Sequence, residues 1–314
     1  MKTVKIKVHA KINLTLEIVG IKDGYHMLDS LVASLDMFDL VLLKKRKDKL
    51  SAVTMKGLDS DKIPVDNNAL KAAEAFSKRF DVTGAEITVH RNIPMGAGLG
   101  GSSADIAGVL NGMAKLYGID DRKAVEQLAE ELGSDSKYML TGGFARMQGR
   151  GELLTPLSVH TPLHFLLICP QSTVSAGACY KEYDALVEGR AEKTKDVTEN
   201  CIRLLQENGV NEVGRYLMND LFAPAVRLNP DILTAYEEAK SFSPLGVVMT
   251  GSGSCVLALF ESKELCEWAK SRYKGKFKTY VAKTVIPNGE KDKGSIRNPF
   301  ALTAEELSGY TDGE

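Results

Sequence analysis

A glycine-rich segment, residues 94–105 (Pro-Met-Gly-Ala-Gly-Leu-Gly-Gly-Ser-Ser-Ala-Asp), constrains this chain more than any other part of its sequence. It follows a run typical of a strand and precedes a run typical of a helix. Glycines adopt positive φ angles and let backbone N–H groups approach an anion closely. The first turn of the following helix adds unpaired donors and a partial positive charge. The segment therefore predicts a phosphate-type anion site.

Three other interpretations of this segment were compared. A Walker A loop has Lys directly after its last glycine, where this chain has Ser102, so that loop is excluded. The spacing Gly96-x-Gly98-x-x-Gly101 matches a dinucleotide loop. A dinucleotide loop also needs a strand that ends at its first glycine and a second strand directly after the helix. Here residues 91–94 lie between the strand and the glycines, and another helix follows the first one. An NAD-dependent oxidoreductase is therefore a distant alternative. The third interpretation is a turn that only permits close helix packing. The segment has four glycines in six residues, which is more than such a turn needs.

The N-terminal segment alternates between apolar and polar residues. Every even position from Val4 to Ile18 is apolar, while the odd positions are polar or charged. Strict alternation predicts a strand with one buried face. Fifteen residues at ~3.3 Å each would span about 50 Å, so we expect a bend or two consecutive strands, followed by a turn at residues 22–24.

Strands and helices mix further along the chain without a regular βαβ rhythm, which favours an α+β fold. Strands are predicted at 31–45, 85–91, 163–169, 245–249 and 254–260, and helices at 67–80, 102–117, 121–133, 201–219 and 231–240. Asp66 or Asn67 is expected to cap the first of these helices, and Asp120 or Asp121 the third. The turn-rich stretch 149–162 suggests a domain boundary. We expect a first domain at 1–158, a second domain at 159–290 and a polar tail at 291–314.

The composition limits the partners that the chain can have. Lys and Arg number 40 against 41 Asp and Glu, so no overall charge favours nucleic acid or a membrane surface. The N-terminus lacks the unbroken apolar run of a signal peptide. Five cysteines without a CxxC pair indicate reduced thiols. We expect a cytoplasmic protein, a monomer or homodimer, that acts on a small molecule and has no dedicated metal site.

The glycine segment, with its Pro-x-x-x-Gly-Leu-Gly-x-Ser-Ser-Ala pattern, resembles the ATP loop of the galactokinase, homoserine kinase, mevalonate kinase and phosphomevalonate kinase superfamily, the GHMP kinases. The resemblance implies two α+β domains, the first like domain 2 of ribosomal protein S5 and the second a ferredoxin-like α/β sandwich. It also implies ATP and Mg²⁺ as cofactors. The residues that it assigns to ATP binding are Asn67, Pro94, Gly96, Ala97, Gly98, Leu99, Gly100, Gly101, Ser102, Ser103 and Ala104.

Further motifs resemble, within this superfamily, the kinases that phosphorylate the 2-hydroxyl of 4-diphosphocytidyl-2-C-methyl-D-erythritol in non-mevalonate isoprenoid synthesis. The matching segments, in order from about residue 4 to 260, are Ala10–Leu14, Asp23–Leu28, Gly133–Asp135, Asn219–Leu221 and Thr250–Ser254. Ordered motifs over that length are more specific than the glycine loop alone.

The resemblance assigns a role to each remaining candidate residue. Asp135 would accept the hydroxyl proton, and Lys11 would stabilise the transferring phosphate. Asn13, on the same strand face as Lys11, would contact the acceptor. The other acceptor-binding candidates are Tyr25, His26, Tyr180, Gly251, Ser252 and Gly253. Without the resemblance, Lys11 would be a solvated strand residue, Asp135 a helix N-cap, and Ser102 and Ser103 helix caps.

Two positions depart from the family pattern. Ser102 stands where the family loop usually has a third glycine, and Ser136-Lys137-Tyr138 replaces the apolar-Pro-aromatic sequence that usually follows Asp135. The second departure places a new charge beside the expected base. A GHMP kinase with another alcohol acceptor and a nucleotide-binding regulator without catalysis are therefore kept as alternatives.

Overall fold

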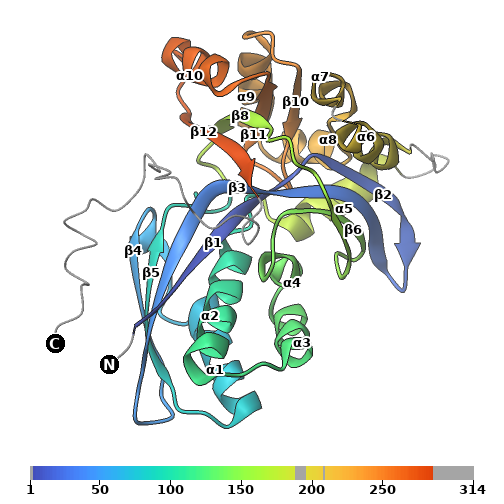
Figure 1. Cartoon of the computed structure of the whole chain (residues 1–314). Coiled ribbons are helices and arrows are strands. Elements are labelled where there is room, and N and C mark those ends of the chain that lie inside the picture. Colours follow the sequence, from blue (N-terminus) through green and yellow to red (C-terminus); the bar gives the residue numbers. More distant parts are fainter. Residues whose placement is uncertain (1–2, 188–195, 208, 286–314) are drawn as a thin grey trace.

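The computed structural model describes residues 3–187, 196–207 and 209–285 (Figure 1). The first half of the chain forms β1 (Val4–Asn13), β2 (Thr15–Lys22), β3 (Tyr25–Lys45), β4 (Ala52–Gly57), α1 (Asn68–Phe80), β5 (Ala85–Arg91), α2 (Gly101–Tyr117), α3 (Arg122–Leu132), α4 (Ser136–Met139), β6 (Phe144–Gly149) and β7 (Leu153–Leu157). The second half forms β8 (His164–Cys169), α5 (Ala176–Val187), α6 (Val197–Gln206), α7 (Val210–Val213), β9 (Met218–Asn219), α8 (Phe222–Leu228), α9 (Asp231–Lys240), β10 (Gly246–Met249), β11 (Val256–Phe260), α10 (Lys263–Arg272) and β12 (Lys278–Val285). Two 3-10 turns lie at Ser60–Lys62 and Gly214–Tyr216.

The long strand β3 organises the N-terminal half. It pairs antiparallel with β1, β2, β5, β6 and β12 along different parts of its length, and β4 joins through β5 (Figure 1). Helix α2 packs closely on β1 and β3 at Gly108. A Cβ there would lie 2.7 Å from a methyl of Val8 and 2.6 Å from a methyl of Val41. Glycine therefore lets α2 approach the sheet and fixes where its N-terminus lies.

The predicted break in the N-terminal strand is confirmed, because β1 ends at Asn13 and β2 begins at Thr15. The alternation does not describe the second half of this segment, however. Lys11, Asn13, Thr15 and Glu17 are all 5% exposed or less. The expectation that Lys11 belongs to a solvated face is therefore wrong. Segments more than 180 residues away in sequence, around Thr198 and Thr250, cover the polar face.

The C-terminal half is a ferredoxin-like sandwich. Its strands have the order β10-β11-β8-β12 and all neighbours are antiparallel. Leu166 and Ile168 of β8 pack with α9 and α10, whereas Phe165 and Leu167 face the larger core shared with the N-terminal half. Alternate residues of β8 thus join two layers. Strand β12 also pairs with β3 at Ser34 and Leu35, which connects the two halves of the sheet.

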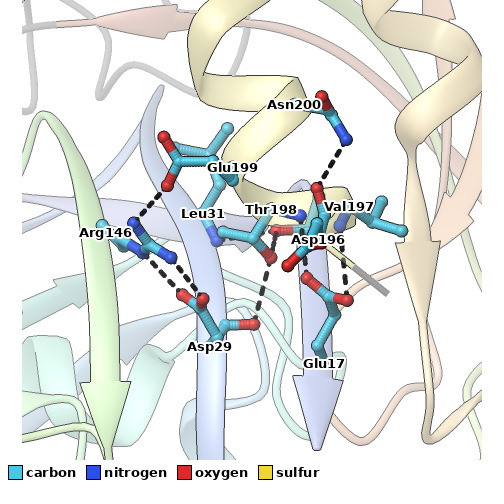
Figure 2. Close-up of polar contacts among 10 residues, drawn as sticks. Glu17, Asp29, Leu31, Arg146, Asp196, Val197, Thr198, Glu199 and Asn200 are labelled. Atoms are coloured by element: carbon cyan, nitrogen blue, oxygen red, sulfur yellow. Dashed lines mark hydrogen bonds and ion pairs between the residues drawn. The ribbon is translucent and has the colours of Figure 1, made fainter. Parts of the chain in front are cut away.

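A polar junction links α6 to the N-terminal sheet (Figure 2). The buried Glu17 carboxylate of β2 accepts the first two backbone N–H groups of α6, residues 197 and 198, at 3.4 and 2.8 Å. Arg146 of β6 forms a two-pronged pair with Asp29 of β3 at 2.8 and 2.6 Å and reaches Glu199 at 2.6 Å. A carboxylate at a helix N-terminus compensates the free N–H donors there. Glu17 therefore anchors α6 to β2.

Most predicted elements are confirmed, including α1 capped by Asn67 and α3 capped by Asp121. The single helix predicted at 201–219 is wrong, because the chain forms α6, α7, a 3-10 turn and β9 there. Gly214 explains the break: a Cβ would lie 2.1 Å from the Leu245 carbonyl oxygen, so the backbone turns against β10.

The predicted tail at 291–314 lies outside the described residues. In the part of the chain described, no helix combines the length and apolar character needed to cross a membrane.

Candidate functional site

One cleft of about 730 Å³ collects nearly all the residues predicted from the sequence. The cleft is lined by residues from both halves of the chain: Lys11, Asn13, Asp135, the aromatic residues Tyr25, His26 and Tyr180, most of the glycine segment, and Gly251 and Ser252. Ala104 and Gly253 do not line it. Ala104 is fully buried in α2, and a Cβ on Gly253 would lie 2.9 Å from Met249 Sδ. These two residues belong to the packing behind the cleft.

The glycine segment makes a tight loop between β5 and α2. Gly96, Gly98 and Gly100 have φ angles of +64°, +74° and +76°, a region that favours glycine. A Cβ on Gly98 would lie 2.2 Å from the Thr250 carbonyl oxygen, so the loop meets the second half of the chain at backbone distance. Helix α2 has Gly100 as its N-cap, and within the described residues its first N–H groups receive no side-chain capping bond. These donors are available to an anion.

Ser102 and Ser103 lie inside the first turn of α2, and both line the cleft. The interpretation of these serines as helix caps is therefore wrong, since the N-cap position is Gly100. Replacement of the family's third glycine by Ser102 leaves the positive-φ glycines of the loop in place. The departure adds a hydroxyl to the anion site and removes none of its backbone geometry.

Lys11 and Asp135 form an ion pair beside this loop. Lys11 Nζ lies 3.2 Å from Asp135 Oδ2, with side-chain exposures of 6% and 27%. Asp135 occupies the N-cap position of α4, yet its carboxylate makes no capping bond. A Cβ on Gly100 would lie 2.9 Å from Lys11 Cγ, and the Lys11 N–H donates to the Leu99 carbonyl at 3.0 Å. The ammonium and carboxylate thus converge next to the anion loop.

The charge of Lys137 is directed away from Asp135. Its ammonium pairs with Glu130 and also donates to the Glu152 carbonyl at 3.2 Å. Tyr138 is buried, and its hydroxyl donates to the Gly143 carbonyl at 2.6 Å. The altered sequence after Asp135 is therefore used in packing α4, and its new charge is neutralised on the surface.

A second glycine loop, residues 250–254, closes the cleft from the C-terminal half. Asn13 holds it: its N–H donates to Thr250 Oγ1 at 3.0 Å, and its Oδ1 accepts from Gly251 N–H at 3.2 Å. The same Oδ1 accepts from Lys11 Nζ at 2.6 Å. Asn219 donates to the Gly251 carbonyl at 2.8 Å from the other side. Asn13 therefore connects the ammonium of Lys11 directly to this loop.

Three aromatic residues also line the cleft. His26 stacks on Tyr180 with ring centroids 4.8 Å apart, and its Nε2 lies 2.7 Å from Asp184 Oδ1. Tyr25 is 51% exposed, and the Arg150 guanidinium lies over its ring, 3.6 Å from the centroid. One face of each tyrosine is thus covered by a protein side chain. Burial, and secondly the charge of Asp135, raise the pKa of the Tyr180 phenol.

Asn67 lines the cleft but uses its amide within the protein. Its Oδ1 accepts the Leu70 N–H at 3.1 Å, and its Nδ2 donates to the carbonyls of Pro64 and Val65 at 3.0 and 3.1 Å. It shapes residues 63–67, which border the cleft together with Met95. Any contact of Asn67 with a ligand would add to this structural role.

Sequence reasoning missed several residues of the cleft. Arg91 and Asp105 line it from below the glycine loop, and Arg150 lines its aromatic end. Arg150 stands between Gly149 and Gly151, and a basic residue in such a turn was the available signal. Arg91 and Asp105 lie in a strand and a helix, and no local pattern distinguishes them from solvent-facing charges.

Comparisons with known proteins match this chain to one family. Family models described as GHMP kinases N terminal domain and GHMP kinases C terminal match residues 67–145 and 201–277. A 4-diphosphocytidyl-2-C-methyl-D-erythritol kinase of Caldicellulosiruptor saccharolyticus is 33% identical over 288 residues, which cover 90% of this chain and 97% of the relative. One from Clostridium tetani is 31% identical, with coverages of 90% and 100%.

Solved structures extend the comparison to the fold. A crystal structure of 4-(cytidine 5'-diphospho)-2C-methyl-D-erythritol kinase superposes with a TM-score of 0.75 at 26% identity, covering 89% of this chain and 98% of that chain. Homoserine kinase from Cytophaga hutchinsonii has a TM-score of 0.67 at 18% identity, with coverages of 91% and 95%. The expected two-domain α+β fold is confirmed.

Proposed function

This chain belongs to the 4-diphosphocytidyl-2-C-methyl-D-erythritol kinase family of the GHMP kinases, and we propose that it transfers the terminal phosphate of ATP to the 2-hydroxyl of 4-diphosphocytidyl-2-C-methyl-D-erythritol. The reaction would serve the non-mevalonate route to isoprenoid precursors. The observation that carries the proposal is the Lys11–Asp135 pair, 3.2 Å apart at the edge of the glycine loop. The Asp135 carboxylate makes no capping bond, which supports a chemical role over a capping role.

Asp135 accepts the proton of the acceptor hydroxyl as that oxygen attacks the phosphate. Such a base typically contributes ~10²–10⁴ in rate. Lys11 offsets the negative charge on the transferring group, and the free N–H groups of α2 hold the remaining phosphates. Phosphoryl transfer depends mainly on positioning and charge neutralisation. Direct in-line transfer therefore needs no covalent enzyme intermediate.

Asn13 positions this chemistry. With its Oδ1 shared by Lys11 and Gly251, and one N–H of its amide donated to Ser30 Oγ at 2.8 Å, it has one N–H left for the acceptor. An amide with three internal bonds is rigid, so it fixes the ammonium of Lys11 in place. Docking of the 250–254 loop thus supports the orientation of Lys11.

The aromatic end of the cleft fits the nucleobase of the acceptor. A planar cytosine can stack on the free face of Tyr25 or Tyr180, and His26 supplies a polar ring edge. The guanidinium of Arg150 is a suitable partner for a diphosphate. One cleft lined by these aromatic residues, by Asp135 and by the glycine loop supports an acceptor that carries both a base and a reactive hydroxyl.

Magnesium is implied by ATP chemistry and would neutralise phosphate charge when bound. Among residues 3–187, 196–207 and 209–285, no cluster of three or more His, Cys, Asp or Glu side chains could hold a metal ion. A site without such a cluster fits a magnesium ion that arrives with the nucleotide, because Mg²⁺ is commonly held by phosphates together with one or two protein oxygens. The Ser102 hydroxyl lines the cleft and could supply such an oxygen.

The test is ADP release with ATP, Mg²⁺ and a set of acceptors that includes the cytidyl substrate, homoserine and mevalonate. We expect turnover with the cytidyl substrate and none that depends on the other alcohols. Turnover with another acceptor would favour the alternative of a GHMP kinase of different specificity. Binding of ADP without turnover of any acceptor, together with no effect of Asp135→Asn, would favour the nucleotide-binding regulator.

A further inference from the structure

Three charged side chains are buried together beneath the glycine loop. Arg91 at the end of β5, Asp39 on β3 and Asp105 on α2 are 2%, 0% and 4% exposed. Across the described part of the chain, Arg91 Nε and Nη1, Asp39 Oδ2 and Asp105 Oδ1 have no hydrogen-bond partner. Buried polar groups are nearly always paired, and unpaired buried charges are costly. The fold therefore retains these groups against their cost, which suggests a function.

Arg91 lies directly under the start of α2. Its Nη2 is 3.4 Å from the position that a Cβ on Gly101 would occupy, and both Arg91 and Asp105 line the cleft. Because Gly101 has no side chain, nothing from that residue separates the guanidinium from the first turn of α2. A fixed positive charge thus lies behind the backbone donors of the anion site.

The two carboxylates lie near enough to the arginine to act on its charge, and their protonation decides how far that charge is offset. Asp39 Oδ1 accepts the N–H groups of Asn92 and Ile93 at 2.6 and 2.9 Å, which fixes the end of β5. Burial raises the pKa of Asp39 to about 6 and that of Asp105 to about 7, and Arg91 opposes both shifts. Asp105 also feels the charge of Asp39. Arginine remains protonated throughout, whereas Asp39 is mostly ionised and Asp105 about half ionised at pH 7, so the carboxylates offset the charge of Arg91 increasingly as the pH rises.

We propose that Arg91 is a phosphate-positioning residue, whose buried guanidinium places its charge beneath the first turn of α2 and attracts the phosphates of the bound nucleotide. Asp105 opposes it when ionised, because a negative charge beside Arg91 reduces the attraction for phosphate. This inference rests on the nucleotide binding proposed above. The rival explanation is that Arg91 is only a structural counter-ion for Asp39 and Asp105.

Binding of ADP and of adenosine, measured by calorimetry, separates these explanations. In Arg91→Met we expect ADP to bind on the order of 10-fold more weakly, with adenosine binding unchanged because it has no phosphate. Arg91→Lys should recover part of the loss for ADP. Equal losses for both ligands, or no loss for either, would overturn the proposal. Failure of the wild-type chain to bind ADP would instead count against the proposed function.

Asp105→Asn gives a second test of opposite sign, independent of how well the Arg91 variants fold. The groups that act on Asp105 are Asp39 from β3 and Arg91 from β5. At pH 8 the wild-type Asp105 is mostly ionised, so the variant should bind ADP on the order of threefold to tenfold more tightly. At pH 5.5 variant and wild type should agree, since both side chains are neutral. Weaker ADP binding by the variant at pH 8 would contradict the proposal.

Discussion

Asp105→Asn should also change how the free energy of unfolding depends on pH. Burial first, and the charge of Asp39 second, raise the pKa of the Asp105 carboxyl from 3.8 to about 7, a rise of about 3 units. In the unfolded chain the same carboxyl titrates near its ordinary value of ~3.9. Between about pH 4 and pH 7 the folded protein therefore keeps a proton that the unfolded chain releases.

The sign and size of the effect follow from this proton. Stability linked to a raised carboxyl pKa is fully present below the unfolded value and is lost as the pH rises through the folded value. At ~1.4 kcal/mol per unit, three units amount to a loss on the order of 4 kcal/mol by pH 8. Asparagine has nearly the same shape as the protonated carboxyl and does not titrate. The variant should match the wild type near pH 4 and be more stable at pH 8 by up to that amount.

Urea unfolding followed by far-UV circular dichroism at pH 4 and pH 8 measures this difference. Asp120→Asn is the matched control, because Asp120 is exposed just before α3 and its replacement should leave the pH profile unchanged. If Asp105→Asn and the wild type differ by the same amount at both pH values, the assignment of Asp105 as a buried, largely protonated carboxyl is wrong.

Three further substitutions test other parts of the structure. Asp135→Asn should lower kcat by about 10²–10⁴ and leave thermal stability and ADP affinity unchanged, since the carboxylate caps no helix; a comparable fall in stability would indicate a structural role. Gly98→Ala should abolish ADP binding, because its Cβ would lie 2.2 Å from the Thr250 carbonyl oxygen. Gly118→Ala, with a φ of +66° and no atom within 4 Å of a Cβ, should bind ADP normally in the same assay. Glu17→Gln should reduce the free energy of unfolding by about 1–2 kcal/mol through weaker anchoring of α6, and an unchanged urea midpoint would count against that role.

Local sequence patterns predicted the parts of the fold that local forces determine. The glycine segment, the capping residues Asn67 and Asp121 and the break after Asn13 all follow from backbone preferences within a few residues. The helix predicted at 201–219 failed because Gly214 is needed for a contact with β10, which the local pattern does not contain.

The candidate site was predictable in its components and much less so in its connections. Lys11 and Asp135 were identified by their resemblance to family motifs, whereas the burial of Lys11 depends on the 250–254 loop, which is more than 230 residues away. Arg91 and Asp105 were missed because charged residues are usually exposed, and only the tertiary fold brings them beneath the glycine loop.

The most direct test of the proposed function is the identity of the phosphorylated product. Phosphorus NMR of a reaction with ATP, Mg²⁺ and 4-diphosphocytidyl-2-C-methyl-D-erythritol should show a new phosphomonoester coupled to the 2-position of the acceptor, in step with ADP formation. The signal should be absent with Asp135→Asn over the same period. ADP formation without that ester, or an ester at another hydroxyl, would contradict the proposed transfer of the ATP phosphate to the 2-hydroxyl with the help of Lys11 and Asp135.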